Sequence, residues 1–255
     1  MRGERGRIVG AASYDASMDI TDFWALHDGP VPSPFVGDEP DLSQTTVNLT
    51  VVDLGTLKVP SGLVEVSDPF VTLSESQSFP VPPGEYPVKV TIADVSLAQD
   101  GGHLREAYLS LVLGPGEAVS VEPAVPHGEV NPRDVEDGWW CVGVDAGTVA
   151  FVDAEAVKTC MPPKDWRVWN DELFDHDGED SWFNLMDSHD HHRAGLANIV
   201  LPKAEHGENL VLAHSGWGDG AYPVALTRDA EGNPVGLHID LQILIEEEDE
   251  DEDDY

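Results

Sequence analysis

The sequence predicts a mainly β domain of the α+β class, with an antiparallel sheet that is either sandwich-like or a meander and carries one or two inserted helices. Two observations support this class. Apolar residues alternate with polar ones in several short runs, and Gly, Pro and Asp separate the runs with turn signals. Apolar residues at helical spacing occur clearly only within residues 154–186.

Composition divides the chain into three parts. Residues 1–44 form an irregular N-terminal segment rich in proline and glycine, with one short helix expected within residues 15–26. Residues 45–245 carry the alternating pattern and form a single, mainly antiparallel β domain. Residues 246–255 begin with nine consecutive acids, which have no apolar side chain to bury, so we expect this acidic tail to be disordered.

Strands are expected first on either side of the turn signal at residues 60–62. Residues 88–92 and 105–113 then form an antiparallel pair with one buried face, because apolar residues alternate in both. Residues 140–144 and 150–153 predict a further hairpin, with the bend at the glycine between them.

The helical region follows directly. Residues 154–159 and 182–186 predict short helical turns, and between them Trp166, Trp169 and Leu173 have the spacing of a helix that packs on the core. The C-terminal part is expected to be a meander of three strands, residues 209–213, 222–226 and 235–245.

Charge is the most unusual property of the chain. It has 13 Lys and Arg against 49 Asp and Glu, a formal net charge of −36, and without the nine acids of the tail the remaining net charge is still −27. Such a surface repels nucleic acids and anionic membranes and attracts basic proteins or cations. We therefore expect no direct nucleic-acid or membrane binding. Either the acidity serves a basic partner, or it serves only solubility at high salt.

Localisation and redox state follow from what the sequence lacks. No run approaches the roughly 20 apolar residues needed to span a bilayer. The apolar run after the basic N-terminus is too short for a secretion signal, so we expect a cytoplasmic protein. Cys141 and Cys160 are too few for a disulfide framework and are expected to be isolated thiols, with a single bridge as the alternative.

The most distinctive stretch runs from His214 to Pro223, where three glycines alternate with one tryptophan and one aspartate. Glycine lets the backbone adopt positive φ or approach another group closely, so the stretch is either a ligand-binding turn or a tight hairpin. The candidate ligand-binding residues are Ser215, Trp217, Asp219 and Tyr222, together with Asp145 at a second glycine turn. If the two turns adjoin, the two carboxylates could bind a cation or share acid and base roles.

A second candidate is a histidine-rich segment with His189, His191 and His192. Imidazole and carboxylate ligands suit Zn²⁺, Ni²⁺ or Cu²⁺, so a divalent metal is the one cofactor that we consider. The spacing matches no established metal motif, and a hydrophilic loop that happens to contain histidines is the alternative. A serine hydrolase is weakly supported, because Ser215 does not lie in a Gly-x-Ser-x-Gly motif.

Several segments carry a family resemblance. They are residues 57–62 with Asp68-Pro69-Phe70, residues 82–88, residues 143–148 and residues 215–223. In this order they resemble an uncharacterised bacterial family, the domain of unknown function four-two-four-one, over roughly residues 53–245. The resemblance implies a soluble, largely β single domain. It brings no established activity and no assigned catalytic residues.

Two functions remain open. The first is a non-catalytic, acidic binding module that engages a basic protein partner, as a toxin-neutralising or nuclease-masking protein would. The alternative is a metal-assisted hydrolase that uses Asp145, Asp219 and some of the histidines.

Overall fold

The alternating apolar residues form two antiparallel sheets. The computed structural model describes residues 19–35, 45–130 and 138–245. The large sheet has the order β1 (Gly29–Pro32), β2 (Thr46–Val59), β5 (Gly84–Asp94), β6 (Leu104–Val112), β13 (Pro234–Asp240), β12 (Gly220–Arg228), β7 (Ser120–Pro123), and β8 (Cys141–Val144) also pairs with β12. The small sheet has the order β10 (Leu196–Val200), β11 (Asn209–His214), β9 (Thr148–Asp153), β3 (Leu63–Ser67), β4 (Ser78–Pro80). The mainly β, antiparallel class that we predicted is confirmed.

Short helices form a third layer. They are α1 (Ala154–Cys160), α2 (Trp166–Trp169), which continues as a π-helical turn (Asn170–Phe174), and α3 (Trp182–Asp187), and a 3-10 turn at Ile20–Asp22 precedes the sheets. The N-caps of the three α-helices are Asp153, Asp165 and Ser181, whose side chains accept hydrogen bonds from the first turn. The three helical segments that we expected between residues 154 and 186 are therefore present.

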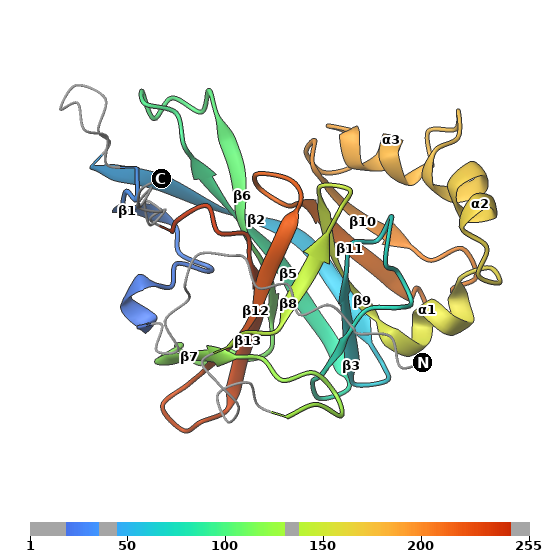
Figure 1. Ribbon diagram of the computed structural model, residues 1–255, viewed down its shortest axis with the longest axis horizontal. Coiled ribbons are helices and arrows are strands. Elements are labelled where there is room, and N and C mark those ends of the chain that lie inside the picture. The colour runs from blue at the N-terminus through green and yellow to red at the C-terminus, as the bar shows by residue number, and fades with distance from the viewer. Residues whose placement is uncertain (1–18, 36–44, 131–137, 246–255) are drawn as a thin grey trace, which may run out of the picture.

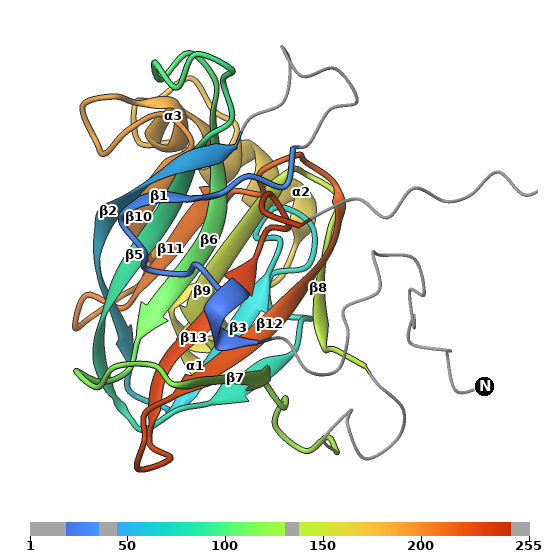
Figure 2. The same ribbon diagram turned by 90° about the vertical axis from the view of Figure 1, so that its left-hand side faces the viewer.

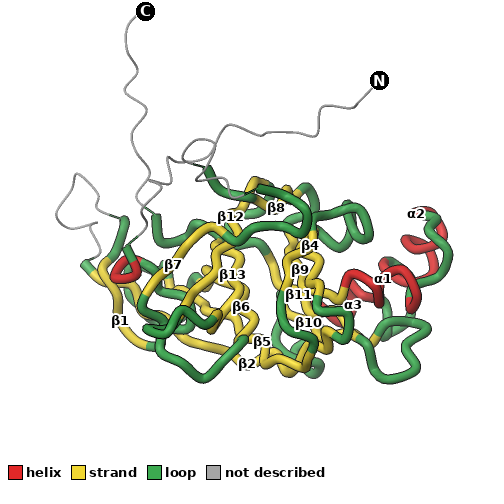
Figure 3. Tube along the Cα trace, turned by 90° about the horizontal axis from the view of Figure 1, so that it is seen from below, coloured by secondary structure: helices red, strands yellow, loops and turns green. Residues whose placement is uncertain are grey.

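The small sheet lies between the large sheet and the helices. Val149 and Phe151 of β9 pack in the core shared with the large sheet, whereas Ala150 and Val152 pack in the core shared with the helices. This alternation places successive side chains on opposite faces of the strand, and both faces are covered. Figure 3 shows the helices beyond the small sheet at one end of the molecule, and Figure 2 shows the large sheet curving from β2 to β12.

A pair of asparagines joins the two sheets on the side of β2. The side-chain amide of Asn198 donates to the carbonyl of Leu54 at 2.9 Å, and that of Asn209 donates to the carbonyl of Thr56 at 2.8 Å. These carbonyls flank Gly55, where the register of β2 against β5 shifts and φ is 86°. A Cβ atom at position 55 would lie only 2.8 Å from the side-chain amide nitrogen of Asn198. A glycine at this bulge therefore leaves room for the asparagine to reach the β2 backbone.

Two pairings expected from the sequence are wrong. Strand β8 does not form a hairpin with β9, because β8 pairs with β12 and β9 pairs with β11 and β3. The C-terminal strands are not a meander of three, because β11 belongs to the small sheet while β12 and β13 pair in the large sheet. The physical reason is burial: β9 is buried on both faces and suits a covered sheet, whereas β8 alternates exposed and buried residues.

Other expectations have mixed outcomes. The pairing of residues 88–92 with 105–113 is confirmed by β5 and β6. Strand β1 lies within the N-terminal segment that we expected to be irregular, and residues 15–18 and 246–255 lie outside the described residues. Both cysteines are free, as expected for isolated thiols. Across the described ranges, every helix is too short or too polar to span a bilayer.

Candidate functional site

The two glycine turns that the sequence singled out are crossovers between the sheets, and they lie side by side. Residues 145–147 lead from β8 of the large sheet to β9 of the small sheet, and residues 215–219 lead back from β11 to β12. Since β8 pairs with β12 and β9 with β11, the two loops are neighbours (Figure 1). We call residues 145–147 and 215–219 the paired crossovers.

Direct hydrogen bonds join the two loops. The backbone N–H of Ser215 donates to the carbonyl of Gly147 at 3.0 Å. The N–H of Gly147 donates to a carboxylate oxygen of Asp219 at 3.1 Å. Gly147 has a φ of 64°, which a glycine adopts at little cost. The two candidate turns therefore form one hydrogen-bonded unit.

Asp68, which follows β3, holds the first crossover in place through its side chain. Its side chain is fully buried. One carboxylate oxygen accepts from the backbone N–H groups of Asp145 at 2.9 Å and Ala146 at 2.7 Å. The other accepts from the hydroxyl of Thr148 at 3.0 Å and the N–H of Phe70 at 3.1 Å. Four donors thus satisfy one buried carboxylate, which fixes the loop to the small sheet.

Ser215 and Tyr222 close the second crossover. The hydroxyl of Ser215 donates to the carbonyl of Gly218 at 2.6 Å, and the hydroxyl of Tyr222 donates to the same carbonyl at 2.7 Å. Both residues are buried, and burial raises the pKa of Tyr222. The Ser215 hydroxyl therefore uses its proton to hold the loop together.

Gly216 brings the second crossover close to β6. Its φ is 66°, and an added Cβ would lie 2.9 Å from the carbonyl oxygen of Glu106 and 2.7 Å from Cδ1 of Ile243. Any larger residue would push the loop away from the core. Gly216 therefore lets the loop lie close to β6, and this position of the loop determines where the neighbouring Trp217 is placed.

Trp217 is the exposed side chain of the paired crossovers, with 53% of its surface accessible. The guanidinium carbon of Arg105 lies over its ring, 5.1 Å from the centroid. The ring of His103 packs edge-on against it at 5.9 Å. A cation over one face and an aromatic edge hold the indole in place and leave the rest of it open to solvent.

A buried acid lies beside this aromatic group. Glu106 follows Arg105 on β6 and is 6% exposed. Burial raises the pKa of Glu106, while the charges of His214, Arg193 and Arg105 act in the opposite direction. These three cationic residues therefore lie close enough to the buried carboxyl to favour its charged form, although burial has the larger effect.

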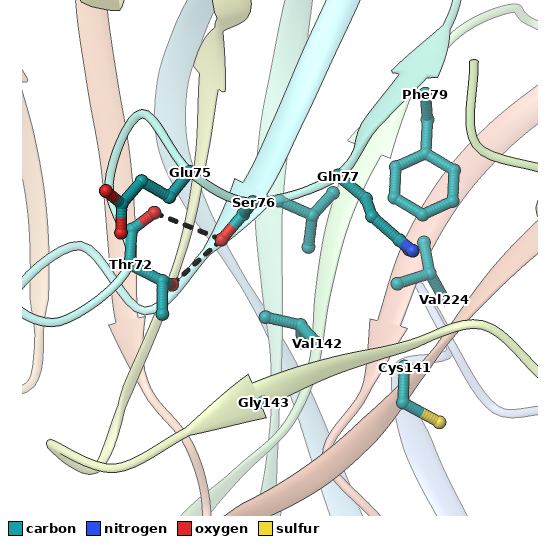
Figure 4. A pocket seen from close by; sticks show the side chains of 10 residues that line it. Thr72, Glu75, Ser76, Gln77, Phe79, Cys141, Val142, Gly143 and Val224 are labelled. Carbon is teal, nitrogen blue, oxygen red and sulfur yellow. Dashed lines mark hydrogen bonds between the residues drawn. The ribbon is translucent and has the colours of Figure 1, made fainter. Parts of the chain in front are cut away.

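The remaining candidates, Asp145 and Asp219, have exposed side chains. Two hollows among the described residues include neither of these carboxylates nor Trp217. One hollow, of about 170 Å³, lies between β4 and β8 and is lined by residues such as Gln77, Phe79 and Cys141 (Figure 4). With Trp217, Asp145 and Asp219 exposed, the paired crossovers present an open surface.

The histidine-rich segment lies elsewhere, before β10. His191 Nε2 lies 3.0 Å from the backbone carbonyl oxygen of Asn198, and its ring packs edge-on against His192 at 5.1 Å. Burial lowers the pKa of His192, and the charge of His191 adds to this effect. His189 is exposed. Within the part of the chain that the structure describes, no three His, Cys, Asp or Glu side chains are placed to hold a metal ion together.

The fold and the paired crossovers define a mainly β domain of two antiparallel sheets linked by glycine-dependent loops. A family model described as "Protein of unknown function (DUF4241)" matches residues 57–239, so the chain belongs to this family, as the sequence motifs suggested. The matched segment contains Asp68 and both crossovers. No curated protein and no solved structure matches the chain.

Sequence reasoning found the two turns but missed the residues that organise them. In the sequence, Asp68 stands out only as part of the Asp68-Pro69-Phe70 motif, whereas its carboxylate accepts hydrogen bonds from residues 77 to 80 positions later in the chain. Arg105 and Glu106 carried no local signal, because their roles depend on a loop more than 100 positions away. An aspartate directly before a proline at a strand end is the local signal that prompts a search for such a role.

Proposed function

We propose that this protein is a non-catalytic binding module that engages a basic protein partner through the paired crossovers. The observation that carries the proposal is the exposure of a held tryptophan on the same pair of loops as two exposed carboxylates. Trp217 is 53% accessible, and Asp145 and Asp219 are exposed on the same hydrogen-bonded unit. Tryptophan is among the residues that dominate binding energy in protein interfaces.

The indole is well prepared for binding. Arg105 and His103 contact Trp217 before any partner is present, so ordering this side chain on association loses less conformational entropy than ordering a free one. Asp68 and Ser215 likewise hold the loop backbone through hydrogen bonds. A preorganised surface of this kind is well suited to recognition of a partner.

Charge supports a basic partner. The net charge of −36 attracts a cationic protein over a long range and raises the rate of encounter. At contact, the carboxylates of Asp145 and Asp219 can accept hydrogen bonds from Arg or Lys of the partner, and the open part of the Trp217 ring can pack against the alkyl stem of such a side chain. A basic toxin or nuclease that this protein neutralises has the required chemistry.

Affinity capture at low salt from cells that produce the protein tests this proposal. Wild-type protein should enrich proteins of high isoelectric point, and W217A should lose them, because a central tryptophan contributes about 2 kcal/mol or more, roughly 30-fold in Kd. V200A is the matched control, since Val200 is 61% exposed on β10 but lies outside the paired crossovers.

Two outcomes would contradict the proposal. Capture of the same basic proteins by wild type and W217A would move the interface away from the paired crossovers. Enrichment of acidic or neutral proteins alone would remove the electrostatic argument.

A further inference from the structure

Three of the five lysines of this acidic chain line one hollow. They are Lys158, Lys164 and Lys203, and the hollow has a volume of about 410 Å³. It lies beside α1 and α2, in the helical layer at the end of the molecule shown at the right of Figure 1. A cluster of cations on a chain with a net charge of −36 is a local reversal of the general surface charge.

The three lysines come from separate segments that the fold brings together. Lys158 lies in the last turn of α1, and Lys164 lies in the connection between α1 and α2. Lys203 lies in the connection between β10 and β11, and its backbone N–H donates to the carbonyl of Cys160 at the end of α1 at 2.8 Å. This hydrogen bond fixes the third lysine against the helix that carries the first.

The hollow combines these cations with apolar and hydroxyl groups. Its other lining residues are Ser74, Val157, Thr159, Met161, Pro162, Pro163 and Trp169. The indole N–H of Trp169 donates to the carbonyl of Pro162 at 3.3 Å, so the ring is held and its polar atom is occupied. An apolar lining with a few converging polar groups, at a volume of several hundred Å³, is typical of small-molecule sites.

The lysines are only weakly neutralised. Lys158 pairs with Glu155 at 2.7 Å and Lys164 pairs with Glu75, but these carboxylate side chains are 54% and 61% exposed. Lys203 forms no ion pair with any residue that the structure describes. Exposed ion pairs contribute little to stability, so an incoming anion can replace the two glutamates at small cost.

A buried acid nearby does not cancel this charge. Glu65 hydrogen-bonds to the backbone N–H of Ser74, which lines the hollow. Burial raises its pKa to about 7, against the opposing charges of Lys158 and Lys164. Glu65 is therefore partly protonated at neutral pH, and the cationic character of the lysines remains.

We propose that this hollow binds a small organic anion, in which a phosphate or carboxylate group contacts Lys158, Lys164 and Lys203 and an apolar body packs beside Met161 and Trp169. This site is separate from the paired crossovers and does not depend on the function proposed for them.

Calorimetric titration of the full chain with phenyl phosphate, inorganic phosphate and phenol tests the proposal. Phenyl phosphate should bind most tightly, because it supplies both the anion and the apolar body. Inorganic phosphate should bind more weakly and phenol should show no binding. Absence of binding by phenyl phosphate at millimolar concentration, or equal affinity for phenyl phosphate and inorganic phosphate, would overturn the proposal.

Two variants, one expected to weaken phenyl phosphate binding and one expected to strengthen it, test whether the ligand binds in this hollow. K203Q should weaken phenyl phosphate binding about tenfold, the loss expected for one charge-assisted hydrogen bond. E75Q should strengthen binding several-fold, because it frees Lys164, and a damaged fold would not produce this gain. K89Q is the control and should bind as wild type does, since Lys89 pairs with Asp53 on the large sheet. Equal affinities of K203Q, E75Q and K89Q would contradict the assignment.

Discussion

At the scale of single residues, the paired crossovers depend on one buried acid. Asp68 accepts four hydrogen bonds, one from Phe70 and three from residues 145–148, although only its position before a proline marks it in the sequence. A carboxylate is the one short side chain with enough acceptor capacity for this arrangement. Its loss would leave one buried hydroxyl and three partly buried N–H groups without this acceptor, and an unsatisfied buried donor costs more than its hydrogen bond contributes.

D68A should therefore lower the free energy of unfolding by about 3–5 kcal/mol, because the buried hydroxyl of Thr148 and three partly buried N–H groups lose their acceptor. Urea denaturation followed by far-UV circular dichroism measures this change. D145A is the control in the same loop, and it should change stability by no more than about 0.5 kcal/mol, since its side chain is exposed. Similar losses in the two variants would contradict the role of Asp68.

At the scale of elements, the sequence predicted where most strands lie but did not predict their partners. The alternation in residues 88–92 and 105–113 was read correctly because β5 and β6 are neighbours in sequence and in the sheet. Residues 140–144 and 150–153 are equally close in sequence, yet the chain between them crosses from one sheet to the other. Pairing with a distant strand leaves no local signal, so the hairpin prediction failed.

The same limit applies to the candidate site. The glycines, Trp217 and the two aspartates were identified from composition, because a glycine-rich turn is visible in the sequence. That the two turns touch follows only from the pairing of β8 with β12 and of β9 with β11. The contact between Trp217 and Arg105 likewise depends on β6, which lies next to neither crossover in sequence.

The junction of the two sheets offers a test at this scale. Asn209 donates to Thr56 and Asn198 and accepts from the backbone N–H of Lys58 at 3.0 Å. N209A should lower the free energy of unfolding by about 2–3 kcal/mol, because three partly buried groups lose their hydrogen-bond partner.

Thermal and urea unfolding of N209A should be compared with those of N48A, a change at an exposed residue of β2 that should alter stability by about 0.5 kcal/mol or less. If N209A is as stable as N48A, the asparagine pair does not hold the sheets together.

At the scale of the whole molecule, the free energy of unfolding should depend on pH through two buried groups, His238 and Glu65, whose effects on stability have opposite signs. His238 is buried between the hydroxyls of Thr227 and Ser110, and burial lowers its pKa from 6.5 to about 3. Between these values the unfolded chain binds a proton that the folded chain does not, so stability falls as pH falls. Glu65 has its pKa raised to about 7, so below pH 7 it acts in the opposite direction.

H238Q isolates the contribution of the histidine. Relative to wild type, the variant should gain about 2 kcal/mol in free energy of unfolding when the pH is lowered from 7 to 5, because it removes a group that must stay neutral in the fold. Urea titrations of both proteins at several pH values measure this difference. H27Q, at an exposed histidine, should follow wild type, and a constant difference between H238Q and wild type would contradict the prediction.

The central claim of the binding proposal is that the acidic surface attracts a basic partner and that Trp217 forms the main contact with it. The most direct test is the association rate of the captured basic partner with wild type, W217A, D145N/D219N and E172Q/E179Q over a range of salt concentrations. Wild-type association should slow steeply with salt. W217A should raise the dissociation rate, and D145N/D219N should slow association more than E172Q/E179Q, which removes the same charge from the helical layer. Association that ignores salt, or equal effects of the two charge pairs, would contradict the proposal.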